Sequence, residues 1–141
     1  WSPWHLGANL LGCAVVAVFG IAARVPARAT AAWLLAWPLS HAALALQPLL
    51  TSYGGLSGVL HAGVAIAAWH LLWHETGPRR QIGAAVMAGL LVKLLLEKPW
   101  GAPTQTMAGW DFPVAPLAHA TGAVAGIACA GLVDALARTK T

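Results

Sequence analysis

The chain has 141 residues, of which 59% are hydrophobic and only 9% are charged. Soluble domains carry roughly 25% charged residues, so this composition argues against a soluble fold. The formal net charge of +4 would suit an acidic partner, but no further feature supports binding to nucleic acid. The apolar runs instead predict an all-α, polytopic membrane helical bundle with a single domain over residues 1–141, because a backbone in lipid must satisfy its own hydrogen bonds.

Five apolar runs have about the length needed to cross a bilayer and are predicted to be transmembrane helices. They cover residues 5–23, 30–50, 57–74, 81–97 and 116–137. Prolines at positions 38 and 48 are expected to kink or end the second of these helices. Cys13 and Cys129 lie within apolar spans and are interpreted as small buried hydrophobic residues rather than as a disulfide or metal site.

Basic residues occupy every second segment outside the predicted spans. Arg24 and Arg28 lie around the connection between the first and second spans, Arg79 and Arg80 lie between the third and fourth, and Arg138 and Lys140 follow the fifth. Cytoplasmic connections carry an excess of Lys and Arg. This pattern places Thr141 in the cytoplasm and places Trp1 and the loops 51–56 and 98–115 on the opposite side of the membrane.

In the first span, His5 and Asn9 are four residues apart and therefore lie on one helical face. Polar groups in a membrane helix are costly and usually face the protein interior or a wet cavity. The two side chains could simply satisfy neighbouring backbone groups, and this structural alternative stays open. Two hydrogen-bond donors on one face would also suit the stabilisation of an anion.

The third span begins at Ser57, within the stretch T-S-Y-G-G-L-S-G-V-L-H. Gly55 and Gly58 flank the serine and leave room for close approach of other groups. A serine at the start of a helix is often only an N-cap, which is the structural alternative here. His61 follows one helical turn later on the same face as Ser57.

The fourth span carries Lys93 and Glu97 near its external end, at a spacing of four residues. We expect an internal ion pair that limits the cost of two charges in lipid; a proton relay or a contact with substrate is the alternative. The loop 98–115 that follows is long and contains several aromatic residues. Such a loop can be a lid or binding segment, or an aromatic belt at the membrane interface.

The fifth span opens with His119, and Gly122 and Gly126 follow on the same face. The G-x-x-x-G spacing lets another helix come very close. Gly58 and Ala62 form a matching small-residue stripe on the third span. This match predicts that His119 is brought against the start of the third span.

Four polar residues on three spans are thus expected at one membrane level, namely His5, Asn9, Ser57 and His119. A histidine can activate a serine as a nucleophile, and the oxyanion that forms needs preorganised donors. No third, orienting carboxylate is expected at this level, since Asp134 is at the far end and Asp111 is in the loop. The sequence therefore predicts a Ser–His dyad, with His119 within hydrogen-bond reach of Ser57 and His61 packed beneath the pair.

Three motifs together resemble the rhomboid family of intramembrane serine proteases. They are H-x-x-x-N at residues 5–9, G-L-S-G at residues 55–58 and H-x-x-G-x-x-x-G at residues 119–126. The run Y-G-G-L-S-G-V-L-H and the K-x-x-x-E of the fourth span further resemble the rhombosortase branch. The chain would match helices two to six of the six-helix rhomboid core, with the first core helix missing from it.

The resemblance implies a serine endopeptidase in which Ser57 is the nucleophile, His119 is the base, and His5 and Asn9 line the oxyanion hole with Ser57. Many rhomboids carry a tyrosine at the position of His61. The implied partners are membrane lipid and a transmembrane protein substrate, specifically a C-terminal single-span anchor of a secreted protein. No metal, small-molecule cofactor or nucleic acid is implied. The implied location is the bacterial inner membrane, with the active site on the extracytoplasmic side.

Two other functions remain as alternatives at the level of sequence. A catalytically inactive rhomboid-like scaffold would bind membrane helices without cutting them. The histidines of the third span, at positions 61, 70 and 74, could instead ligate a haem.

Overall fold

Five α-helices make up the fold of this chain. The computed structural model describes residues 2–50 and 52–139, and within them it contains no strand, only an isolated bridge between Gln105 and Val114. The helices are α1 (Pro3–Ala22), α2 (Ala27–Leu44), α3 (Ser57–His74), α4 (Gly77–Glu97) and α5 (Pro116–Arg138). The prediction of an all-α fold is therefore confirmed. The predictions that concern Trp1, Thr51, Lys140 and Thr141 lie outside the described residues.

Prolines account for the two largest differences between the helix boundaries and the predicted spans. α2 ends at Leu44, so its predicted extension to residue 50 is wrong. Pro48 accounts for this end, because proline has no N–H to offer the carbonyl four residues earlier and its ring clashes with that carbonyl. α4 begins at Gly77, four residues earlier than predicted, with a proline in its first turn, a position that proline favours.

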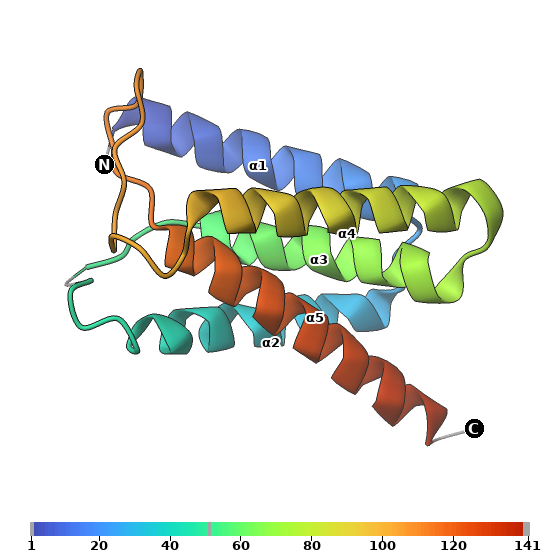
Figure 1. Cartoon of the computed structure of the whole chain (residues 1–141). Coiled ribbons are helices and arrows are strands. Elements are labelled where there is room, and N and C mark those ends of the chain that lie inside the picture. The colour runs from blue at the N-terminus through green and yellow to red at the C-terminus, as the bar shows by residue number, and fades with distance from the viewer. Residues whose placement is uncertain (1, 51, 140–141) are drawn as a thin grey trace.

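Consecutive helices run in alternating directions, as Figure 1 shows. The starts of α1, α3 and α5 consequently lie at the same end of the molecule, together with the loop 98–115. α3 is the central helix and packs against each of the other four, whereas α1 packs on α3 alone among the described helices. This arrangement places the polar starts of three helices side by side.

The closest helix contact joins α3 and α5 through glycine. A Cβ atom on Gly122 would collide with the backbone carbonyl oxygen of Gly58, and one on Gly126 would lie 2.6 Å from the carbonyl oxygen of Ala62. In the other direction, a Cβ on Gly58 would lie 2.7 Å from the carbonyl oxygen of Ala118. The predicted match between the two small-residue stripes is therefore confirmed.

Side-chain hydrogen bonds also join α3 to α2 and to α5. Trp33 of α2 donates its indole N–H to the carbonyl oxygen of Val59 at 2.7 Å. Near the C-terminal end of α5, the Asp134 carboxylate accepts from the indole N–H of Trp69 at 2.9 Å and lies 2.7 Å from Nε2 of His74. These bonds satisfy polar groups that would otherwise be left inside an apolar bundle.

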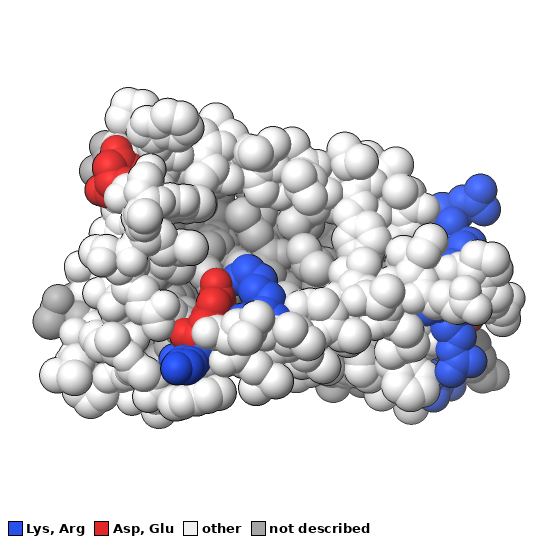
Figure 2. Space-filling view, turned by 45° about the horizontal axis from the view of Figure 1, so that its top comes forward, with Lys and Arg blue, Asp and Glu red and all other residues white. Residues whose placement is uncertain are grey.

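Charge is distributed unevenly along the molecule. Lys and Arg side chains gather at one end, whereas a small group of acidic and basic atoms lies beside a hollow in the other half (Figure 2). By length and composition, α1 and α5 are long and apolar enough to cross a membrane. That all five helices do so stays a prediction, as does the side of the membrane that the basic end faces.

The glycine contact gives a first testable prediction. Gly122→Ala should lower the free energy of unfolding by about 1–3 kcal/mol, because the added methyl group has to push the two backbones apart. Gly89→Ala in α4 is the matched control, since a Cβ there meets no atom within 4 Å. Unfolding of both variants in detergent micelles measures the difference. Equal stabilities of the two variants would contradict the proposed backbone contact.

Candidate active site

A cavity of about 960 Å³ opens at the end where α1, α3 and α5 begin. Its lining includes all four polar residues that were predicted to share one level, which are His5, Asn9, Ser57 and His119. Lys93, Glu97 and Tyr53 also line it, as do Met107, Trp110 and Phe112 of the loop 98–115. The structure thus brings together residues from four helices and two loops.

Ser57 is the first residue of α3, but its hydroxyl does not cap the helix. The N-cap position belongs to Leu56 and has no side-chain cap bond, so the interpretation of Ser57 as a simple N-cap is wrong. Its Oγ instead forms a hydrogen bond with the Tyr53 hydroxyl at 3.0 Å, and this hydroxyl also accepts the N–H of Gly58 at 3.3 Å. The nucleophile candidate therefore faces the cavity with a phenol beside it.

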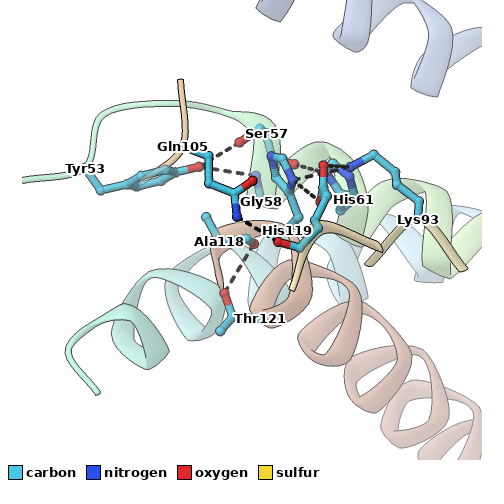
Figure 3. A network of polar contacts seen from close by, with 10 residues as sticks. Tyr53, Ser57, Gly58, His61, Lys93, Gln105, Ala118, His119 and Thr121 are labelled. Carbon is cyan, nitrogen blue, oxygen red and sulfur yellow. Dashed lines mark hydrogen bonds and ion pairs between the residues drawn. The ribbon is translucent and has the colours of Figure 1, made fainter. Parts of the chain in front are cut away.

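His119 lies in the first turn of α5 and is only 5% exposed. Its ring is shown between Ser57, His61 and Lys93 in Figure 3. The predicted hydrogen bond with Ser57 is not formed among the described residues, because the Ser57 hydroxyl is directed to Tyr53. His119 instead forms its bond through Nδ1, which lies 2.7 Å from Oε2 of Glu97.

Glu97 overturns the prediction that no carboxylate lies at the level of the serine and histidine. It is the last residue of α4, and α4 ends at the same end of the molecule at which α5 begins. Its other oxygen, Oε1, lies 2.6 Å from the Lys93 ammonium group, so the predicted Lys93–Glu97 ion pair is confirmed. The carboxylate thus has two partners, of which the sequence interpretation recognised only the lysine.

The ring of His61 packs on the face of the His119 ring. The two imidazole rings are stacked, with centroids 4.1 Å apart and an angle of 12° between their planes. Nδ1 of His61 lies 2.6 Å from the backbone carbonyl oxygen of Ser57 and must be the donor, since a carbonyl can only accept. His61 was predicted to pack beneath a hydrogen-bonded pair of Ser57 and His119, and it packs on His119 and on the Ser57 backbone, whereas the Ser57 hydroxyl is bonded to Tyr53.

The two residues predicted for the oxyanion hole approach the start of α3 from α1. The Asn9 side-chain oxygen accepts the backbone N–H of Leu56 at 3.3 Å. The His5 ring stacks on Phe112 with centroids 4.3 Å apart. A Cβ on Gly55 would lie 3.4 Å from Nε2 of His5, an ordinary van der Waals contact, so the His5 ring lies next to the backbone just before α3.

The loop 98–115 extends across the cavity from α4 to α1. Asp111 accepts a hydrogen bond from the Ser2 hydroxyl at 2.8 Å, at the start of α1. Gln105 donates its side-chain amide to the backbone oxygen of Glu97 at 3.0 Å, and it pairs with Val114 through two backbone bonds. These contacts favour the lid or binding-segment interpretation of the loop; Trp100, which is 70% exposed, is not part of the lining.

Tyr53 was not identified from the sequence as part of the site, and Glu97 was recognised only as the partner of Lys93, with a proton relay or a contact with substrate as the alternative. Glu97 could have been found, because the predicted topology already placed the end of α4 at the external level. Tyr53 carried no such signal, since its place over Ser57 depends on how the loop before α3 folds. Within the described part of the chain, no group of three or more His, Cys, Asp or Glu residues could hold a metal ion.

Comparisons of the chain with models of protein families, with curated proteins and with solved structures each found no match.

The stacking of His61 gives a second prediction, with stability as its readout. His61→Ala should lower the free energy of unfolding by about 1–3 kcal/mol, because it removes both a stacked ring pair and a buried hydrogen bond. His61→Phe keeps a flat ring against His119 and should lose less. Unfolding of the two variants in the same detergent measures this difference. If alanine and phenylalanine cost the same, the stack does not stabilise the site.

Proposed function

We propose that this chain is an intramembrane serine endopeptidase of the rhomboid type. The observation that supports it most directly is one cavity that contains Ser57 at the start of a helix and His119 on the neighbouring helix. His119 uses Nδ1 for its carboxylate partner, so its Nε2 is the nitrogen left to act as a base. The proposal combines this geometry with the three sequence motifs of the rhomboid family.

In the first step, Ser57 Oγ attacks the carbonyl carbon of the scissile peptide bond while His119 Nε2 takes its proton. The Ser57 hydroxyl has to turn from Tyr53 toward His119 for this transfer. Negative charge then develops on the former carbonyl oxygen. Donors that could stabilise it are the backbone N–H groups at the start of α3 and the side chains of His5 and Asn9.

In the second step, the C–N bond breaks and the leaving amine receives the proton from His119. The remaining acyl group is an ester on Ser57 Oγ. A water molecule then attacks this ester, giving a proton to His119 and forming the new carboxyl group, and the proton finally returns to Ser57. Each proton taken up by His119 is released again, so the cycle returns both Ser57 and His119 to their starting states.

The surface of the helices supports an integral membrane location. Large apolar side chains are exposed along helices of the bundle, and on α1 they include Leu6, Leu10, Leu11, Val15, Val18 and Ile21. Exposed apolar area of this kind is rare on soluble monomers. We propose that it contacts lipid in a bacterial inner membrane, with the basic end and the C-terminus in the cytoplasm and the cavity on the extracytoplasmic side.

The proposed substrate is a transmembrane protein, namely a single-span C-terminal anchor of a secreted protein, as the rhombosortase resemblance implies. A membrane helix has to unwind locally before its peptide bond can reach a serine. Small, flexible residues near the external end of the anchor would make this unwinding easier. The site of cleavage is therefore expected after a small-residue motif at that end.

A second candidate is a catalytically inactive scaffold that binds membrane helices. One observation favours it, which is that the Ser57 hydroxyl bonds to Tyr53 and not to His119. A cleavage experiment separates the two candidates, because a scaffold would bind the anchor without cutting it.

Cleavage of an anchored reporter tests the proposed activity. Cells that express the protein should release a secreted reporter carrying a C-terminal single-span anchor, and Ser57→Ala or His119→Ala should abolish this release. Ser40→Ala and His70→Ala are matched controls whose side chains do not line the cavity, and both should cleave. His61→Tyr, which restores the commoner rhomboid residue, should keep measurable activity. Undiminished release by Ser57→Ala would overturn the proposed activity.

Accessibility of introduced cysteines tests the proposed orientation. Cysteines placed at Arg24 or Arg80 should react with an impermeant reagent only after the inner membrane is permeabilised, since positive connections stay in the cytoplasm. A cysteine placed at Trp100, in the exposed part of the loop over the cavity, should react in spheroplasts without that treatment. Labelling of Arg24 and Arg80 positions from outside would reverse the orientation and contradict the proposed side of the active site.

A further inference from the structure

We infer that Glu97 is a positioning residue that holds His119 in the tautomer with the proton on Nδ1, so that Nε2 is the base for Ser57. This inference rests on the proposed function, and it extends the Ser–His dyad expected from the sequence to three groups. It is carried by the contact between Glu97 Oε2 and His119 Nδ1 at 2.7 Å. Lys93, bound to the other carboxylate oxygen at 2.6 Å, completes the arrangement.

Only one assignment of donors and acceptors fits these three side chains. The Lys93 ammonium group can only donate, and an ionised carboxylate can only accept. Lys93 also lies 3.3 Å from His119 Nδ1, but this separation is longer than either contact with Glu97. Nδ1 must therefore donate its proton to Glu97, while Lys93 donates to the opposite oxygen of the same carboxylate. A neutral imidazole has one N–H, so Nε2 carries the lone pair.

The carboxylate is itself held in place from several sides. Glu97 ends α4, and the residue after it, Lys98, has the left-handed conformation that closes the helix. Gln105 donates its side-chain amide to the Glu97 backbone oxygen at 3.0 Å, which attaches the loop over the cavity to this residue. On the other side, the stacked ring of His61 restricts tilting of His119. The histidine and its acceptor therefore have little freedom to separate.

This geometry assigns Glu97 a task that a simple ion pair does not need. A carboxylate on the far nitrogen of a histidine base fixes its tautomer and orientation, and it stabilises the imidazolium that forms when the serine gives up its proton. An ion pair that only neutralises Lys93 would be equally served by a carboxylate directed away from His119. The placement of Oε2 on Nδ1 is what distinguishes the two roles.

A spectroscopic measurement tests the tautomer without requiring any cleavage. Protein labelled with ¹⁵N-histidine in detergent is examined by NMR at alkaline pH, where the two nitrogens of a neutral ring have distinct shifts. The His119 signals are assigned by their loss in His119→Gln. In the unaltered protein, the Nδ1–H form should predominate. In Glu97→Gln, Lys93 or the new amide can donate to Nδ1, so the Nε2–H form should appear. An unchanged tautomer in Glu97→Gln would overturn the inference.

Kinetics on the anchored reporter in purified form give the second readout. Glu97→Gln should lower kcat by about 10²–10⁴-fold and change KM little, because substrate binding does not involve the far side of the histidine. Lys93→Met leaves the contact between Glu97 and His119 in place, so it should lose far less kcat and retain the Nδ1–H signal. An equal loss in both variants would show that the ion pair, and not the bond to His119, is what matters.

The double variant Lys93→Met, Glu97→Gln covers the case in which Glu97→Gln alone fails to fold, because it leaves no unpaired ammonium group in the bundle. It should show the same loss of kcat and the same Nε2–H signal as the single variant. Failure of the proposed function has a different signature: the unaltered protein cuts no reporter, while the tautomer still depends on Glu97. If cleavage requires Ser57 and His119 but Glu97→Gln keeps its full kcat, only the inference about Glu97 falls.

Discussion

The contact between α3 and α5 determines where every other part of the site can lie. Glycines at positions 58 and 122 let the two backbones touch, and Gly126 continues the contact one turn further. Without side chains between them, the first turns of the two helices lie next to each other, and these turns carry Ser57 and His119. A larger residue at this contact would therefore change both the packing of the bundle and the distance between the two groups.

The polar groups of the site form a connected set inside a mostly apolar protein. Lys93 and Glu97 form an ion pair, and the other oxygen of the same carboxylate lies 2.7 Å from Nδ1 of His119. In the proposed membrane location, unpaired charged groups would be costly, so the pairing of Lys93 with Glu97 would limit this cost. The stacked ring of His61 adds a contact that needs no charge. Stability and the proposed chemistry are thus supported by the same contacts.

The hydroxyl of Ser57, the proposed nucleophile, is bonded to the hydroxyl of Tyr53. Tyr53 binds both the Ser57 hydroxyl and the Gly58 N–H, and these are groups that the proposed reaction uses for attack and for oxyanion stabilisation. The loop over the cavity is fixed to α1 through Asp111 and to α4 through Gln105. In the proposed reaction, a substrate segment would enter beneath this loop and displace the tyrosine hydroxyl.

The sequence by itself determined the helical class, the end of the molecule at which His5, Ser57 and His119 meet, and the pairing of the two small-residue stripes. These follow from local properties, namely apolar run length, the alternation of basic connections and residue spacing on a helical face. Only the tertiary structure decided that Glu97 reaches His119, that Tyr53 occupies the Ser57 hydroxyl and that α2 ends at Leu44. The first two depend on the directions of side chains from separate segments, which spacing along one helix does not specify. The third depends on how strongly Pro48 opposes continuation of the helix, for which the sequence allowed either a kink or an end.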